Sequence, residues 1–273
     1  MGVVVSLLNQ KGGVGKTSTC HHVSGALCGT GRRILLVDND PQASLTQGFF
    51  GPEAMRACGF GESVAALYDP DFAAVSEAVI RPTGIAGVEI VPGSVRLTQF
   101  NQLPTDRWGE SEYGIREFLA EVRGDYDLIL IDNPPNLHLC GWAALTASDG
   151  LVVPLQAEDY GAQGIVAVME AMAAVRARTN PALRMVGLLL TMYDKRLGIH
   201  VAYERQLRDL YGGEVFEATF PLAKDFKEAV AARLPVSLYK PRSAAAKAIQ
   251  AVGEELLRRI DPMGDSGAER SAA

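Results

Sequence analysis

The sequence lacks several features that would identify other classes of protein. No apolar run approaches the roughly 18 residues that span a membrane. The chain begins in a strand-like segment without the basic and apolar regions of a secretory signal, so we expect no signal peptide. Its four cysteines, Cys20, Cys28, Cys58 and Cys140, show no CxxC spacing. This argues against a disulfide scaffold and favours a reducing, cytoplasmic location.

A general excess of positive charge is also missing. The net charge of the 273-residue chain is −6, which argues against a wholly basic nucleic-acid-binding protein. The charge is unevenly divided, because residues 1–150 carry 10 Lys and Arg against 17 Asp and Glu, whereas residues 151–262 carry 15 against 13. Any surface that binds a polyanion is therefore expected mainly in the second half of the chain.

Apolar runs and helical patterns alternate along the chain. Buried strands are predicted at 3–8, 32–38, 87–93, 126–132, 150–156, 185–193 and 214–221, and helices at 17–27, 111–122, 161–178, 202–211 and 243–260. Continuous apolar runs are typical of strands covered on both faces, so the pattern predicts a doubly wound, mostly parallel α/β fold with helices on both faces. We expect one domain over residues 1–262 and a disordered tail over 263–273.

The stretch NQKGGVGKTS, residues 9–18, directly follows the first predicted strand. Its glycines allow backbone amides to turn toward an anion, and a helix that begins near Lys16 directs its positive end to the same point. Lys16 would then contact the β- and γ-phosphates of a nucleotide, and the Thr17 hydroxyl would bind Mg²⁺. The strict phosphate-loop pattern has glycine at position 10, where this chain has Gln10, so the match is to a variant loop.

Carboxylates follow two of the predicted strands. LLVDNDPQAS places Asp38 and Asp40 at the end of one strand, and YDLILIDNPPNL places Asp132 at the end of another. Doubly wound sheets bind ligands at the carboxyl ends of their strands. An apolar strand that delivers one carboxylate to a magnesium shell is the Walker B arrangement. Taken alone, the Asp38–Asp40 segment would also be ordinary turn chemistry.

The segment Lys11 to Thr17, KGGVGKT, resembles the deviant Walker A motif of the ParA/MinD family of P-loop ATPases, and NQKGGVGKT is similar to its ParA/Soj branch. The resemblance implies that Lys11 crosses a dimer interface and contacts the nucleotide of the partner subunit. That role is like the role of an arginine finger. The alternative is that Lys11 is a solvated loop lysine. The fold implied is that of a P-loop NTPase of the deviant Walker A type.

The same resemblance assigns roles to the carboxylates. DNDPQ is similar to the DxDPQ motif of the family, which implies that Asp40 orients the attacking water and that Asp38 supports Mg²⁺ through its water shell. The catalytic residues implied are Lys11, Lys16 and Asp40, and the metal-binding residues are Thr17, Asp38 and Asp132. The family commonly has IDCPPS after the Walker B strand, where this chain has Asn133 and Asn136.

Later segments extend the resemblance to residues 3–260. GLLLTMYDKR (187–196) and FPLAKDFKEA (220–229) are similar to segments that lie near the nucleotide base in the family. The nucleotide-binding residues implied are Lys11, Gly12, Gly13, Val14, Gly15, Lys16, Thr17, Ser18, Met192, Tyr193, Asp194 and Pro221. The cofactors implied are ATP and Mg²⁺, and the activity is a slow, partner-stimulated hydrolysis of ATP.

Members of this family close into a dimer with ATP, and the dimer then binds a surface. The C-terminal segment DPMGDSGAERSAA has no aromatic residue, unlike a membrane-binding amphipathic helix, so we expect non-specific DNA rather than a MinD-like membrane surface. The resemblance implies a nucleoid-associated homodimer, a ParB-like stimulating protein and a cargo such as a chromosome or plasmid. The candidate DNA-binding residues are Lys195, Arg196, Arg205, Lys224, Lys227, Arg233, Lys240 and Arg242.

Two positions depart from the pattern at this expected DNA surface. Leu222 and Asp225 stand where the family often has arginine, and Lys224 and Lys227 are nearby basic residues that could compensate. No helix-turn-helix extension precedes the first strand, so we do not expect sequence-specific operator binding.

Two alternatives come from other classes. A reductase of the nitrogenase-iron-protein type would use Cys140 as a cluster ligand, but Cys58 lies in a poor match to the second ligand loop. A metabolic ATPase of the dethiobiotin or cobyrinate type would transfer phosphate to a small carboxylate.

Overall fold

A single eight-stranded sheet organises the chain. The computed structural model describes residues 1–53, 58–157 and 161–270. The strands are β1 (Val3–Leu7), β2 (Ile34–Asp38), β3 (Arg81–Pro82), β4 (Val88–Val91), β5 (Leu128–Asp132), β6 (Gly150–Gln156), β7 (Arg184–Tyr193) and β8 (Phe220–Pro221). Their spatial order is β3-β4-β2-β5-β1-β6-β7-β8, and every pair is parallel except β3 with β4. The predicted doubly wound, mostly parallel fold is confirmed.

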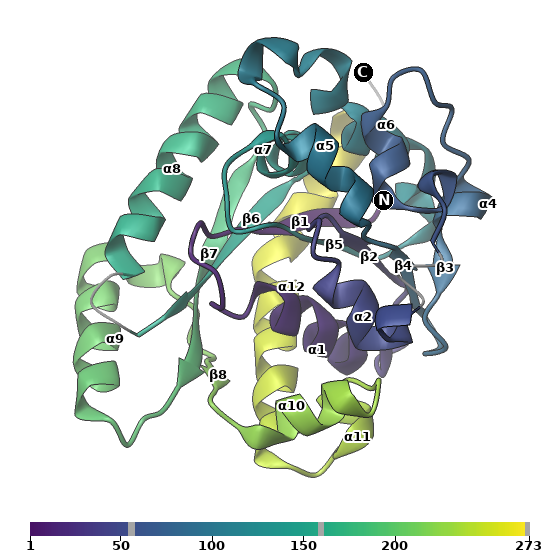
Figure 1. Cartoon of the computed structure of the whole chain (residues 1–273). Helices are drawn as coiled ribbons and strands as arrows, with labels where there is room; N and C mark the ends of the chain where they lie inside the picture. Colours follow the sequence, from purple (N-terminus) through teal and green to yellow (C-terminus); the bar gives the residue numbers. More distant parts are fainter. Residues whose placement is uncertain (54–57, 158–160, 271–273) are drawn as a thin grey trace.

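Helices cover both faces of this sheet (Figure 1). They are α1 (Lys16–Cys28), α2 (Ser44–Phe50), α4 (Ser76–Val79), α5 (Thr98–Asn101), α6 (Gly114–Val122), α7 (Leu139–Ala147), α8 (Gly161–Arg178), α9 (Gly198–Tyr211), α10 (Lys224–Ala231), α11 (Val236–Tyr239) and α12 (Ala244–Arg270). The predicted helices at 17–27, 161–178 and 202–211 correspond to α1, α8 and α9. The sequence did not predict the short helices α2, α4, α5, α10 and α11.

The strand residues alternate between two hydrophobic clusters. Val3, Val5 and Leu7 of β1 face a cluster that includes α1 and α12, whereas Val4 faces the cluster of α6 and α7. The 3₁₀ segment Val64–Tyr68 belongs to that second cluster. Both faces of the central strands are therefore buried, as the continuous apolar runs predict.

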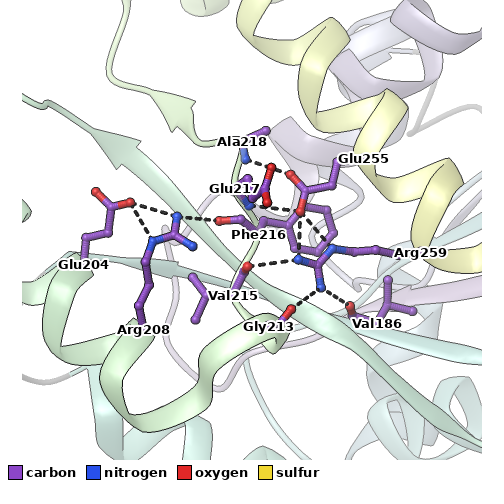
Figure 2. A network of polar contacts seen from close by, with 10 residues as sticks. All are labelled: Val186, Glu204, Arg208, Gly213, Val215, Phe216, Glu217, Ala218, Glu255 and Arg259. Carbon is purple, nitrogen blue, oxygen red and sulfur yellow. Dashed lines mark hydrogen bonds and ion pairs between the residues drawn. The ribbon is translucent and has the colours of Figure 1, made fainter.

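The prediction of a strand over 214–221 is largely wrong. Only Phe220 and Pro221 form β8, and a 3₁₀ turn occupies Gly212–Glu214. Side chains take the place of a neighbouring strand here, because Glu255 accepts hydrogen bonds from the backbone N–H groups of Glu217 (2.9 Å) and Ala218 (2.7 Å). Figure 2 shows that Arg208 reaches this segment from α9 on one side, and that Glu255 and Arg259 reach it from α12 on the other.

Two arginines complete this network. Arg259 donates to the carbonyl oxygens of Val186, Gly213 and Val215, and Arg208 donates to that of Phe216. The apolar residues of the segment fit a strand pattern, but only one bridge joins it to β7, where the Phe216 N–H donates to the carbonyl oxygen of Leu188 (2.9 Å). Most of its other backbone hydrogen bonds go to side chains of helices that are distant in sequence. A local pattern does not contain that information.

The last helix is longer than predicted. α12 continues from Ile260 to Arg270, into the segment expected to be a disordered tail. Met263 packs against the same hydrophobic cluster as Ile260, so an apolar contact supports the helix beyond the predicted end. Residues 271–273 of the predicted tail lie outside the described residues.

The Glu255–Arg259 pair provides a test of this architecture. Glu255 is buried and its carboxylate lies 2.8 Å from the Arg259 guanidinium. We expect Arg259→Met to lower the free energy of unfolding by about 3 kcal/mol, because it leaves a buried carboxylate without its cation. Urea denaturation measures this loss. The control is Arg258→Met at the neighbouring exposed position, and an equal effect of the two substitutions would contradict the structural role of Arg259.

Candidate functional site

A cavity of about 480 Å³ lies where α1 begins, at the carboxyl ends of the central strands. Residues 12–18 form one wall, and Asp40, Pro135 and Met192 contribute from other segments. Gly13 and Gly15 have φ angles of 75° and 85°, a conformation that favours glycine. A Cβ at Gly15 would also lie 3.4 Å from Thr191. The loop therefore holds its shape through glycine conformations and close packing.

Lys16 lies beneath this loop. Its side chain is 6 % exposed, and its ammonium group donates to the carbonyl oxygens of Asn9 (3.0 Å) and Lys11 (3.2 Å). Burial lowers the pKa of Lys16, and the nearby carboxylates of Asp132 and Asp40 offset part of that effect. A phosphate at the N terminus of α1 would give the ammonium group a charged acceptor, which forms a stronger hydrogen bond than a carbonyl.

Two carboxylates are buried side by side below the cavity. Asp38 of β2 and Asp132 of β5 are register partners, and neither side chain is exposed. Asp38 accepts hydrogen bonds from the Thr46 backbone N–H (2.7 Å) and hydroxyl (2.6 Å). Burial raises the pKa of Asp38 to about 7. Burial and the neighbouring Asp38 raise the pKa of Asp132.

These carboxylates fit a magnesium site. Among the described residues, the second oxygen of Asp38 and both oxygens of Asp132 are buried without a hydrogen-bond partner. Two adjacent buried carboxylates repel each other unless a cation lies nearby. No group of three His, Cys, Asp or Glu side chains in the described part of the chain could hold a metal alone. Mg²⁺ would therefore share its coordination with Thr17 and with nucleotide phosphates, as Mg²⁺ commonly does.

Asp40 reaches the cavity from the segment between β2 and α2. Its carboxylate accepts a hydrogen bond from the backbone N–H of Gln42 (2.9 Å), and its carbonyl oxygen accepts one from Ala43 (2.8 Å). Ala43 has a φ angle of 51°, which is uncommon for a residue with a side chain. This tight turn directs Asp40 toward the phosphate loop, and Gln42 lines the same cavity.

The two asparagines near the carboxylates are hydrogen-bonded to each other. Asn39 donates to the side-chain oxygen of Asn133 (2.9 Å) and to the carbonyl of Cys140 (2.9 Å). Asn133 donates in turn to the carbonyl of Leu7 (3.1 Å). Asn133 therefore joins the ends of β1, β2 and β5, which explains how this chain accommodates the departure from the common IDCPPS pattern.

Of the four residues predicted near the nucleotide base, Met192 lines the cavity, whereas Tyr193, Asp194 and Pro221 are not among its lining residues within the described chain. Lys11, predicted to contact the partner's nucleotide, does not line it either. Tyr193 donates a hydrogen bond to Glu204, and Asp194 pairs with Arg196 at 2.7 Å. Sequence reasoning missed His21, Ser44, Leu45, Gly48 and Val230, which also line the cavity. His21 lies one helical turn after Ser18, a spacing that could have identified it.

The candidate DNA-binding residues fall into two groups. Lys240 pairs with Asp225 and Glu228, Lys224 with Glu228 and Arg196 with Asp194, while Arg233 donates to the carbonyl of Gln47. Lys195, Arg205, Lys227 and Arg242 are exposed. Asp225, which departs from the family pattern, is thus a partner of Lys240. Arg196, Lys224 and Arg233 are exposed as well. The second group, Lys195, Arg205, Lys227 and Arg242, is the better candidate for phosphate contacts, because its charge is not neutralised by an ion pair among the described residues.

Two further observations concern the alternatives. Cys140 is fully buried in the hydrophobic cluster of α6 and α7, and burial raises the pKa of its thiol. Within the described residues, no helix is long and apolar enough to cross a membrane.

Comparisons with known proteins agree with this geometry. A family model described as an AAA domain matches residues 2–185. The chain is 34% identical to the chromosome-partitioning ATPase Soj of Thermus thermophilus, over 94% of this chain and 96% of that protein. It is 32% identical to the chromosome partitioning protein ParA of Caulobacter vibrioides, over 94% of each.

Solved structures show the same fold. The structure of cobyrinic acid a,c-diamide synthase from Mycobacterium smegmatis, with bound ADP and magnesium, has a TM-score of 0.77 and 30% identity, and the match covers 94% of this chain and 95% of that chain. A putative plasmid partition protein of Borrelia burgdorferi bound to AMPPNP has a TM-score of 0.76 at 19% identity and covers 95% and 100%. At that identity the second match is evidence for the fold alone.

Lys16 is the residue on which nucleotide binding should depend most. We expect Lys16→Ala to weaken the binding of a fluorescent ATP analogue roughly 100-fold, because it removes charge-assisted hydrogen bonds to phosphate. Titration in the presence of Mg²⁺ measures the affinity. Lys227→Ala, at an exposed position outside the cavity, is the control. An unchanged affinity in the folded Lys16 variant would contradict the assignment of the loop.

Proposed function

The chain belongs to the ParA/Soj family of P-loop ATPases, and on that premise we propose that it is a partition ATPase whose ATP-bound dimer holds DNA. The protein is an ATPase that uses ATP and Mg²⁺. The proposal rests on the two lysines of the loop. Among the described residues Lys16 lines the cavity and Lys11 does not. Lys16 binds the nucleotide of its own subunit, and Lys11 contacts the nucleotide of the partner subunit.

Asp40 would orient the attacking water in this arrangement. Asp40 lines the same cavity as the phosphate loop, while Asp38 and Asp132 are fully buried. The half-buried carboxylate of Asp40 can accept a proton or a hydrogen bond from water, and the buried pair would supply negative charge for Mg²⁺. Lys16 would stabilise the charge that develops on the γ-phosphate. A ParB-like protein would stimulate this hydrolysis and so release the DNA, with the ATPase located at the nucleoid.

A pair of variants tests the roles of Lys11 and Asp40. We expect Lys11→Ala to bind ATP with the affinity of the wild type but to remain monomeric, because it leaves the cavity-lining residues in place and removes the charge that would contact the partner's nucleotide. Asp40→Ala should accumulate as an ATP-bound dimer, because it binds nucleotide but hydrolyses it slowly. Size-exclusion chromatography with light scattering, in ATP and in ADP, measures both. Normal ATP-dependent dimerisation of Lys11→Ala would refute the role across the interface.

DNA binding is tested by co-sedimentation with ATP, ADP and no nucleotide at two salt concentrations, with anionic liposomes in parallel. The proposal expects ATP-dependent binding to DNA and none to liposomes. The double variant Lys227→Ala/Arg242→Ala should lower the slope of log affinity against log salt by up to about 2, because each phosphate contact contributes about 0.9. Arg96→Ala/Arg107→Ala, exposed residues of the acidic half, form the matched control. Equal binding in all nucleotide states would contradict the switch.

One observation favours a second candidate function. The protein from Mycobacterium smegmatis, to which this chain is 30% identical, is named as a synthase of cobyrinic acid a,c-diamide, so a metabolic ATPase that transfers phosphate to a small carboxylate is the alternative. Such an enzyme would show ATP turnover that depends on a carboxylate substrate and not on DNA. The partition function expects the opposite dependence.

A further inference from the structure

A second groove lies away from the nucleotide cavity, and the two share no lining residue within the described chain. It encloses about 280 Å³ between the 3₁₀ segment Val64–Tyr68, with the turn that follows it, and the start of α6. Gly114 allows the two walls to approach, because a Cβ there would lie 1.7 Å from the carbonyl oxygen of Leu67. The groove is therefore built into the packing of α6.

The floor of this groove is apolar and one wall is aromatic. Leu67 and Phe118 lie at its base. Phe72 is 41% exposed, and its ring packs edge-to-face against Phe60 at 5.3 Å and over Gly61. An exposed aromatic ring held in a fixed position is typical of a recognition surface, because little conformational entropy is lost when a partner binds to it.

The rim of the groove carries charge of one sign. Asp69, Glu110, Glu117 and Glu121 line it, and no Lys or Arg does among the described residues. None of these four carboxylates takes part in an ion pair within the described part of the chain. The arginine of α6, Arg116, instead stacks on Tyr113 at 4.6 Å and donates to the carbonyl of Thr179. The negative potential of the rim is therefore available to a partner.

A chain of hydrogen bonds connects this groove to the nucleotide site. Ser111, which lines the groove, donates from its hydroxyl to the carbonyl oxygen of Tyr68 (2.6 Å). The buried hydroxyl of Tyr68 donates to the side-chain oxygen of Asn39 (2.7 Å), and the Asn39 backbone N–H donates to the carbonyl of Asp132 (2.9 Å). Asn39 stands between Asp38 and Asp40 in the chain. A shift of the groove wall would thus be transmitted to Asp38 and Asp132, which would hold Mg²⁺, and to Asp40, which would orient the water.

We propose that this groove is the docking site for a basic amphipathic segment of a partner protein, and that docking there acts on hydrolysis through Tyr68 and Asn39. The occupant follows from charge and shape: lysine or arginine side chains complement the rim, and an apolar or aromatic side chain fits against Phe72. Nucleic acid and anionic lipid are disfavoured occupants, because the rim repels phosphate. The effect of docking on hydrolysis rests on the proposed function. Binding to the groove does not rest on it, because binding requires no nucleotide.

The binding test uses a fluorescent 16-residue amphipathic peptide with lysine on one face and leucine on the other, and the same peptide with glutamate in place of lysine. The rim variant replaces three exposed glutamates with glutamine, Glu110→Gln/Glu117→Gln/Glu121→Gln. It should weaken binding of the lysine peptide roughly tenfold at low salt. The control Glu170→Gln/Asp209→Asn/Glu214→Gln makes the same charge change at exposed positions elsewhere. Anisotropy without nucleotide measures the affinity.

Three outcomes of this test overturn the docking site: equal loss in rim and control variants, no loss in the rim variant, or equal binding of the two peptides. Self-association of the wild type that the rim variant abolishes would also overturn it, because the occupant would then be a second copy of this chain.

The coupling is tested separately with Tyr68→Phe, which removes only the hydroxyl group. The lysine peptide should bind this variant with unchanged affinity, but its effect on the rate of ATP hydrolysis should fall at least tenfold relative to its effect on the wild type. Tyr113→Phe, on the neighbouring segment, is the matched control. Full stimulation in Tyr68→Phe would refute the route through Asn39. Failure of DNA binding with intact peptide binding would count against the proposed function and not against the groove.

Discussion

Asp38 and Asp132 occupy matching positions at the ends of two adjacent strands, and both side chains are completely buried. Two carboxylates so placed repel each other and are poorly solvated, so the arrangement is stable only with a proton or a cation between them. Burial raises the pKa of Asp38 to about 7, and burial together with the charge of Asp38 raises the pKa of Asp132. Bound Mg²⁺ would relieve the repulsion, and the site would therefore gain much of its stability from its ligand.

The residues around this pair share the same constraint. Lys16 is the nearest buried cation, and Asp132 and Asp40 raise its pKa against the effect of burial. Thr46 holds the end of β2 through hydrogen bonds from its backbone N–H and hydroxyl to Asp38, and Asn133 donates from its side chain to Leu7 of β1. The phosphate loop, the carboxylates and the turn at Asp40 are thus one electrostatic unit, in which a change of nucleotide alters the charge that every member experiences.

Sequence reasoning recovered the members of this unit whose signals are local. The glycines, Lys16 and the aspartates at strand ends each occupy a short segment with a characteristic pattern, and the order of the parallel strands brings those segments together. It could not recover contacts between distant segments. Tyr68 reaches Asn39 because its 3₁₀ segment packs in the same hydrophobic cluster as β2. Residues 215–218 have a single bridge to β7 and are otherwise held largely by side chains such as Glu255 and Arg259 of α12.

The same distinction explains one of the two departures from the family pattern at the expected DNA surface. Asp225 looks like the loss of a DNA-binding charge when only its own segment is considered. In the folded chain its carboxylate lies 2.8 Å from the Lys240 ammonium group, which also contacts Glu228. The acidic residue therefore adds a negative charge and also neutralises Lys240, a candidate DNA-binding residue. Positive charge at this surface then depends on residues such as Lys227 and Arg242, which are exposed. Because fewer phosphate contacts mean weaker binding by one subunit, such a surface would rely more strongly on dimerisation to hold DNA.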